Sequence, residues 1–233
     1  MEIKIWSDVR CPFCYIGKRK FETALENFQY RDELTINWKS FQLDPMLETD
    51  PSVSTIDYFV DTKGVSIDQA KQMLNNATQM GAEVELALDF ENSMVANSFN
   101  AHRLIQMAKS KDLGNEIEEA LFKAQLEDGK NIDSQEELIS IGCSIGMNAE
   151  EIKKVLASDE FSYQVKQDEL EARNIGVRGV PFFVFNDKFA VSGAQSPKVF
   201  LQTLEKAWEE FSNSGNQLEI INGESCSTDG TCN

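Results

Sequence analysis

The stretch Asp8-Val9-Arg10-Cys11-Pro12-Phe13-Cys14-Tyr15-Ile16-Gly17 lies between an apolar segment and a helical pattern. Residues 3–7, just before it, are rich in β-branched and aromatic side chains, which predicts a buried strand. Apolar residues then recur at helical spacing over residues 13–28, which predicts a helix with one buried face. The two cysteines are therefore expected where a strand ends and a helix begins.

A helix N-terminus gives a cysteine pair a chemical role. Its unpaired N–H groups and partial positive charge stabilise an anion, so we expect a lowered pKa for Cys11. Pro12 suits the first helical turn, where its missing N–H is not needed. Cys14 follows one turn later, within reach of Cys11 for a disulfide. This arrangement is typical of a thiol–disulfide oxidoreductase.

The composition argues against several kinds of partner. The chain has 22 Lys and Arg against 39 Asp and Glu, a formal net charge of −17, which disfavours nucleic acid and anionic membranes. No segment is long and apolar enough for a membrane span. The first predicted strand begins almost at Met1, without a leader, so we expect a cytoplasmic protein. In a reducing compartment, Cys-x-x-Cys at a strand–helix junction is more often catalytic than structural.

The remaining chain predicts an α/β fold interrupted by helices. Residues 34–39 alternate as a second strand, and residues 54–176 follow helical periodicity. Ser54 and Ser66 are expected to cap the first two helices of this block, with Gly64 and Gly81 as their ends.

Strand signals return at residues 180–185 and 189–193, which predict an antiparallel hairpin. A last helix is expected after Ser196, with Pro197 at its first position. The order βαβ, helical block, ββα is that of a thioredoxin fold with a large all-helical insertion domain. The predicted organisation places the thioredoxin fold in residues 1–53 and 177–213, the insertion in 54–176, and a flexible cysteine-containing tail in 214–233.

Three motifs together resemble the DsbA family, in particular its cytoplasmic FrnE-like branch. The opening motif is Asp8-x-x-Cys11-Pro12-Phe13-Cys14-Tyr15-Ile16-Gly17-Lys18. Gly179-Val180-Pro181-Phe182-Phe183 resembles the family's cis-proline loop, and Ser192-Gly193-Ala194-Gln195 its continuation. Asn97-x-x-x-Ala101-His102-Arg103-Leu104 is similar to a segment of the helical domain in that branch. The resemblance covers nearly the whole chain, to about Phe211, and implies a protein disulfide oxidoreductase or isomerase.

The resemblance also implies roles for the redox-active centre. Cys11 would attack and form the mixed disulfide with substrate, and Cys14 would resolve it. Pro181 would be a cis-proline facing the two thiols. The backbone of Val180 would then be free to pair with an extended substrate segment, beside Pro12 and Phe13.

Asn97, His102 and Arg103 are further candidates for substrate binding, since their segment could line a cleft between the helical block and the thioredoxin fold. For His102, the chain's single histidine, the alternative is a polar residue at the helix surface or partly buried. For Arg103, the alternative is a structural ion pair.

Phe13 stands where the periplasmic oxidant of the family has a histidine between its cysteines. A phenyl ring cannot favour the thiolate as a charged imidazole does. The Pro-Phe pair is closer to glutaredoxin-like motifs, whose potentials lie at roughly −200 to −230 mV. We therefore expect a less oxidising enzyme, with the direction of electron flow left open.

The other three cysteines allow separate interpretations. Cys226 and Cys232 could form a shuttle disulfide that exchanges with Cys11–Cys14, or be exposed thiols without a role. The same four thiols could hold zinc, but the spacing of the second pair and the proline motifs favour redox chemistry, so no metal is predicted. Cys143 lies among apolar neighbours and is interpreted as a small buried hydrophobe.

Two other function classes remain as alternatives. The 2-hydroxychromene-2-carboxylate isomerases and kappa-class glutathione transferases share the insertion architecture, but generally activate glutathione with a single Ser or Cys. Cys14 therefore favours the redox function. A non-catalytic holdase role is the third hypothesis. The expected partners are protein thiol or disulfide substrates and the glutathione or thioredoxin system, with glutathione as a possible co-substrate and no cofactor.

Overall fold

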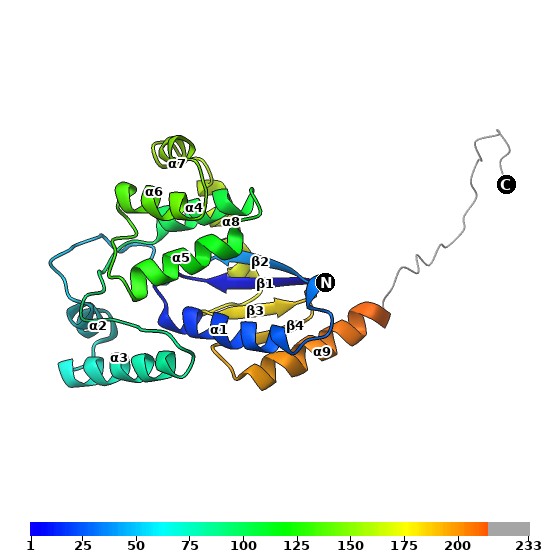
Figure 1. The fold of residues 1–233 in the computed structure, drawn as a ribbon. Helices are drawn as coiled ribbons and strands as arrows, with labels where there is room; N and C mark the ends of the chain where they lie inside the picture. Colours follow the sequence, from blue (N-terminus) through cyan, green and yellow to red (C-terminus); the bar gives the residue numbers. More distant parts are fainter. Residues whose placement is uncertain (214–233) are drawn as a thin grey trace.

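A four-stranded mixed sheet lies at the centre of the computed structural model, which describes residues 1–213 (Figure 1). Its strands, in spatial order, are β2 (Thr35–Ser40), β1 (Glu2–Ser7), β3 (Phe182–Phe185) and β4 (Phe189–Ser192). β1 is parallel to β2 and antiparallel to β3, and β3 is antiparallel to β4. The parallel pair is connected by α1 (Pro12–Glu26), because parallel neighbours need a crossover.

The helices of residues 1–213 lie on both faces of the sheet and beyond its end. α1 and α9 (Pro197–Asn213) pack side by side on one face (Figure 1). A short 3-10 helix, η1 (Arg31–Glu33), precedes β2. The helices inserted between β2 and β3 are α2 (Thr55–Lys63), α3 (Ile67–Ala82), α4 (Phe99–Lys109), α5 (Gly114–Leu126), α6 (Gln135–Ser144), α7 (Ala149–Leu156) and α8 (Ser162–Asn174).

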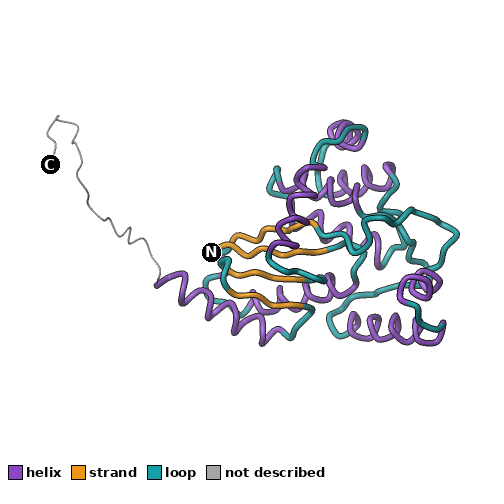
Figure 2. The backbone as a smooth tube through the Cα atoms, turned by 180° about the vertical axis from the view of Figure 1, so that it is seen from behind, coloured by secondary structure: helices purple, strands orange, loops and turns teal. Residues whose placement is uncertain are grey.

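This element order confirms the predicted thioredoxin fold with an inserted helical block. The view from behind shows the strands side by side between the two groups of helices (Figure 2). The predicted caps of Ser54 and Ser66 are present, and Gly64 ends α2 with a φ of 64°. None of the helices in residues 1–213 combines the length and apolar character that a membrane span needs.

The two faces of β1 belong to different cores because strand side chains alternate. Ile3 and Ile5 are fully buried and pack with Phe183 and Phe185 of β3 under α1 and α9. Trp6 points the other way, and its Nε1 donates to the main-chain oxygen of Asp168 on α8 at 2.9 Å. α1 and α9 therefore cover one face of the sheet, and α8 the other.

Asp168 fastens α8 to the sheet. Its carboxylate accepts hydrogen bonds from the backbone N–H of Ser40 at 3.0 Å and from Nε2 of Gln106 at 2.6 Å. Lys39 adds an ion pair at 2.8 Å. The last helix of the inserted block is thus attached to the edge strand β2.

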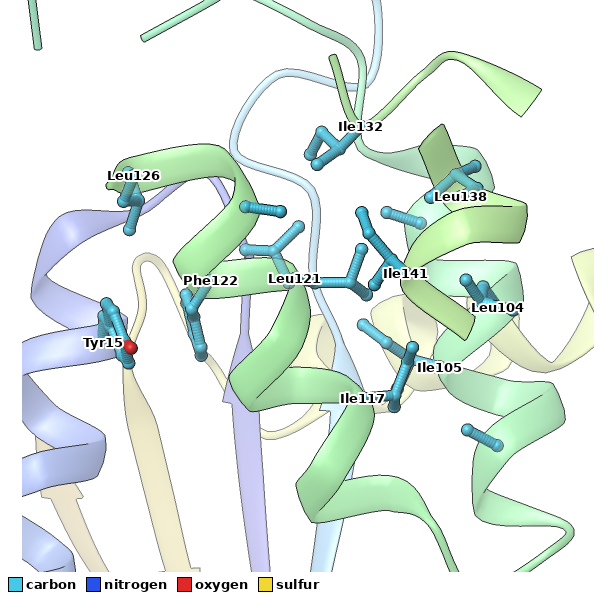
Figure 3. Close-up of a cluster of buried hydrophobic side chains, with 14 of the residues drawn as sticks. Tyr15, Leu104, Ile105, Ile117, Leu121, Phe122, Leu126, Ile132, Leu138 and Ile141 are labelled. Atoms are coloured by element: carbon cyan, nitrogen blue, oxygen red, sulfur yellow. The ribbon is translucent and has the colours of Figure 1, made fainter. Parts of the chain in front are cut away.

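The helical block has its own core, which reaches α1 (Figure 3). Tyr15 of α1 stacks on Phe122 of α5, with ring centroids 4.9 Å apart and planes only 6° apart. Cys14 belongs to the same buried cluster. The cysteine motif therefore lies where the helical core meets the thioredoxin fold.

Two local predictions were wrong. α3 does not end at Gly81 but continues to Ala82. A Cβ on Gly81 would lie 2.8 Å from Cδ1 of Leu88, so the missing side chain allows the segment after the helix to pack against α3. Cys143 is exposed, because on α6 it is Gly142 that faces inward, against Ile152 of α7.

Candidate functional site

Cys11 and Cys14 lie at the start of α1. Cys11 is the N-cap, with extended backbone angles φ −88° and ψ 113°, and Pro12 occupies the first turn. The backbone N–H of Cys14 donates to the carbonyl of Cys11 at 3.0 Å, which closes this turn. Both are thiols, with 5% and 1% of their surfaces exposed. The pair is thus within one helical turn, and Cys11 is the more accessible sulfur.

Burial raises the pKa of the Cys14 thiol well above its ordinary value, and the neighbouring Cys11 raises it further through a hydrogen bond and charge. The backbone N–H of Asp8 and the hydroxyl of Ser7 act in the opposite direction, since both favour the thiolate. Burial outweighs them, so Cys14 keeps its proton in the dithiol form.

The loop of residues 179–181 lies against Cys11 and α1. The Val180–Pro181 peptide bond is cis. The Sγ of Cys11 donates to the carbonyl oxygen of Val180, with 3.6 Å between the heavy atoms. A Cβ on Gly17 would lie 2.9 Å from Cγ of Pro181, so only glycine allows this approach. The structure therefore brings Cys11, Cys14, Val180 and Pro181 together, as the motifs predict.

A cavity of about 450 Å³ opens beside Cys11, between the start of α1 and the helices α2 and α3. Phe13, 40% exposed, and Val180 form part of its wall on the thioredoxin side. Phe59 of α2 and Met73 of α3 line the opposite wall. The cavity is large enough for a small ligand or a substrate side chain next to the reacting sulfur.

A buried polar cluster lies behind the cysteine motif. Asp8 and His102 have no exposed surface, and Oδ1 of Asp8 lies 3.6 Å from Nε2 of His102. The carboxylate of Asp8 also accepts the backbone N–H groups of Arg10 at 3.2 Å and Leu43 at 2.8 Å. Asp8 thereby connects two segments that flank the cavity.

The protonation of this cluster follows from competing effects. Burial opposes ionisation of Asp8, but His102, the charge of Arg10 and the backbone N–H of Leu43 outweigh it and lower the pKa of Asp8. Burial likewise opposes the charged His102, but the Asp8 carboxylate 3.6 Å away outweighs it and raises the pKa of that imidazole. Burial raises the pKa of nearby Glu118 to about 7, against the effects of His102 and Lys18. Each partner of the Asp8–His102 pair thus favours the charged form of the other.

Arg103 and Asn97 do not line the cavity beside Cys11. Arg103 donates to the main-chain oxygens of Val155, Ser158 and Glu160, at 2.6 Å for Ser158 and 2.9 Å for Glu160, and so caps the end of α7. Asn97 donates to the carbonyl of Leu47 at 2.7 Å.

Asn97, His102 and Arg103 therefore contribute nothing to the cavity beside Cys11. Asn97 precedes α4 and lines a separate pocket with Gln42 and Thr49, whereas His102 and Arg103 lie in the buried part of α4. Substrate binding by this segment stays a prediction. His102 is neither at the helix surface nor in the cleft, because Asp8 holds it in the interior.

Arg10 and Tyr58 were missed by sequence reasoning, although both line the cavity. The signal for Arg10 was available, since it is a cation next to Cys11 in an acidic chain. Nothing local marks Tyr58, because only the tertiary fold brings α2 to α1.

The proposed zinc and relay sites involve Cys226 and Cys232, which lie outside the described residues. Within residues 1–213, no group of three or more His, Cys, Asp and Glu side chains is placed to hold a metal ion. Both hypotheses for the tail stay untested.

Comparison with known proteins places this geometry in a family. The DSBA-like thioredoxin domain matches residues 2–205. A probable DsbA oxidoreductase from Streptomyces coelicolor is 34% identical over 100% of this chain and 98% of that chain, with a TM-score of 0.88.

Two more distant structures share the fold. A 2-hydroxychromene-2-carboxylate isomerase is 14% identical over 93% of this chain and 100% of that chain, with a TM-score of 0.66. The cytosolic disulfide reductase DsbM from Pseudomonas aeruginosa, in a structure with GSH, is 13% identical over 92% and 98%, with a TM-score of 0.56. Because the DSBA-like match spans most of the sequence, the chain belongs to the DSBA-like thioredoxin domain family.

Proposed function

We propose that this protein is a thiol–disulfide oxidoreductase that exchanges disulfides with protein or small thiol substrates through Cys11-Pro12-Phe13-Cys14. The observation that carries the proposal is the contrast between the two sulfurs. Cys11 borders an open cavity at a helix N-terminus, while Cys14 lies buried behind it and retains its proton. This contrast suits an attacking thiol followed by a resolving thiol.

The proposed reaction begins at Cys11. The partial positive charge of the α1 N-terminus favours an anionic sulfur there. The Cys11 thiolate attacks one sulfur of a substrate disulfide, and the other sulfur leaves as a thiolate with the electron pair of the broken bond. A mixed disulfide between Cys11 and substrate results.

Cys14 completes the exchange. It loses its proton to the departing thiolate or to solvent, helped by the hydroxyl of Ser7 and the N–H of Asp8. Its sulfur then attacks Cys11, a Cys11–Cys14 bond forms, and the second substrate thiolate leaves. Two electrons have passed from the cysteine pair to the substrate, and the reverse sequence oxidises a substrate dithiol.

Substrate binding is proposed for the surfaces that border Cys11. Val180, whose carbonyl faces the Cys11 sulfur, offers main chain to an extended segment, and Pro181 lies behind it. Pro12 and Phe13 would contact the substrate from the α1 side. A cytoplasmic location, membership of the FrnE-like branch and glutathione as co-substrate remain parts of this proposal.

A glutathione-dependent isomerase or transferase is the second candidate. The shared fold of the chromene-carboxylate isomerase and a cavity of small-ligand size favour it. It needs one activated sulfur and has no use for a resolving thiol, so Cys14 discriminates between the two functions.

Mass-resolved alkylation across a series of glutathione ratios tests the proposal. The wild type should form a Cys11–Cys14 disulfide, Cys14→Ser should accumulate a mixed disulfide at Cys11, and Cys11→Ser should form neither. A Cys14→Ser variant that turns over disulfide substrates like the wild type would disprove a resolving role. If that variant instead keeps full glutathione-dependent isomerase activity, the second candidate is supported.

A further inference from the structure

Arg10 immediately precedes Cys11 and lines the same cavity. Its backbone N–H donates to Oδ1 of Asp8 at 3.2 Å, which fixes the main chain at this point. Its guanidinium carbon lies 5.1 Å from the centroid of the Tyr58 ring, a distance at which a cation and an aromatic ring attract each other. The guanidinium is therefore held in the cavity wall next to the reacting sulfur.

The guanidinium of Arg10 has no carboxylate partner within residues 1–213. The nearby Asp8 forms its ion pair with His102, and Asp44 accepts a hydrogen bond from the Tyr58 hydroxyl at 3.0 Å. Nη1 of Arg10 is buried without a hydrogen-bond partner among the described residues. Because an unpaired buried donor is unfavourable, an acceptor that enters the cavity beside Arg10 gains a strong hydrogen bond.

The charges around the cavity contrast with those of the whole chain. Among residues 1–213, Arg10 and Lys63 line it together with a single carboxylate, Asp44. Lys63 extends over the ring of Phe59, 5.7 Å from its centroid. A local excess of positive charge in a protein of net charge −17 favours an anionic ligand at this position over the rest of the surface.

We propose that Arg10 is a specificity-determining residue that selects small disulfides carrying a carboxylate near the reacting sulfur. The inference rests on the proposed oxidoreductase function and names the substrate class of the same site. The cavity volume of about 450 Å³ fits a small molecule, and its apolar walls cover the ligand's carbon skeleton. The carboxylate pairs with Arg10 while the disulfide lies against Cys11.

The disulfide ligand is itself the oxidant in this reaction, so no further co-reactant is needed. The Cys11 thiolate breaks the ligand's S–S bond, forms a Cys11–S–S–R bond and releases one RS⁻. Cys14 then displaces the second RS⁻, its proton passing to a released thiolate or to solvent. The small disulfide is reduced by two electrons to two thiols, and the cysteine pair is oxidised.

The test compares two disulfides on the same enzyme. Reduced protein is mixed with glutathione disulfide, which carries carboxylates, or with bis(2-hydroxyethyl) disulfide, which is neutral, and the second-order rate constant for Cys11–Cys14 oxidation is measured for each. The ratio of the two constants is the readout. Any effect of Arg10 on the reactivity of Cys11 itself applies to both disulfides and cancels in the ratio.

We expect Arg10→Met to lower the ratio about tenfold, the factor that corresponds to one ordinary charge-assisted hydrogen bond. Arg10→Lys should lose less, since it keeps the charge. The matched control is Arg31→Met, which removes the same charge from an exposed arginine of η1 whose ion-pair partner among residues 1–213 is Asp32. Arg31→Met should keep the wild-type ratio.

Other outcomes separate the two proposals. An unchanged ratio in Arg10→Met overturns the role of Arg10, as does an equal fall in Arg31→Met, which would indicate general charge. If neither disulfide oxidises the wild-type pair, the oxidoreductase function itself fails.

Discussion

Oδ1 of Asp8 lies 3.6 Å from Nε2 of His102, and neither residue has exposed surface. The pair connects the turn before Cys11 with α4, so it joins the redox motif to the helical block. Loss of one partner leaves an uncompensated charge in the interior, which typically costs about 3–5 kcal/mol. We expect Asp8→Asn to lower the free energy of unfolding by roughly this amount, as measured by urea denaturation near pH 7.

The same pair gives a defined dependence of stability on pH. The pKa of His102 is raised in the folded protein, so its contribution is complete below the unfolded value of about 6.5 and is lost as the pH rises through the folded pKa. The pKa of Asp8 is lowered, so its contribution is present above its ordinary value and is lost at lower pH. In a His102→Gln variant, the free energy of unfolding should no longer fall as the pH rises through the folded pKa of His102. A variant whose profile overlays that of the wild type would contradict the charged pair.

Glu118 should reduce stability at high pH. Its pKa is about 7 when folded against an ordinary 4.5, mainly because it is buried. Between these values the unfolded chain releases a proton that the folded protein keeps, so stability falls as the pH rises, by up to about 3 kcal/mol. Glu118→Gln should therefore stabilise the protein at pH 8 and change little at pH 5. Equal effects at both pH values would show that Glu118 does not titrate in this range.

Gly17 should be required for the position of the cis-proline loop. A methyl group at this residue would lie 2.9 Å from Cγ of Pro181, so Gly17→Ala should displace the loop and cost about 1–3 kcal/mol. Disulfide exchange at Cys11 should slow as well. Gly179→Ala is the matched control for stability alone, since a Cβ there meets no atom within 4 Å but Gly179 lines the Cys11 cavity. Normal stability and exchange rates in Gly17→Ala would show that the loop adapts.

Arg103 should affect stability but not redox chemistry. Its guanidinium donates to three main-chain oxygens at and after the end of α7, and Arg103 is not among the residues that line the Cys11 cavity. Arg103→Met should lower the free energy of unfolding by about 1–3 kcal/mol, because these carbonyls lose their donor. The rate of Cys11–Cys14 oxidation should stay at the wild-type level. A large fall in that rate without loss of stability would restore Arg103 to the substrate site.

The sequence predicts the fold well because its signals are local. The strand before Cys11, the helix after it and the hairpin at residues 182–192 are each visible as hydrophobic periodicity, and serine caps mark the starts of α2 and α3. Gly81 misleads because its role is a tertiary contact with Leu88, which no local pattern contains.

The residues of the candidate site also fall into those marked by local motifs and those placed only by tertiary packing. Cys11, Cys14 and Pro181 belong to short motifs, and the structure brings them together. Asn97, His102 and Arg103 also form a motif, but α4 contributes no side chain to the lining of the Cys11 cavity, because its packing against other helices buries it. Tyr58 reaches the cavity only because α2 folds back over the start of α1. The residues next to Tyr58 in the sequence therefore give no sign of its place in the site.

The hydrogen bonds of Asp168 limit which helices can move when the cavity changes its size. By binding Ser40, Lys39 and Gln106 at once, it makes β2, α4 and α8 a single rigid frame. The cysteine motif and Val180 line one side of the cavity, whereas α2 and α3 line the other side and make no hydrogen bond to Asp168. Admission of a bulky substrate would therefore involve displacement of one helical pair, not a swing of the entire inserted block.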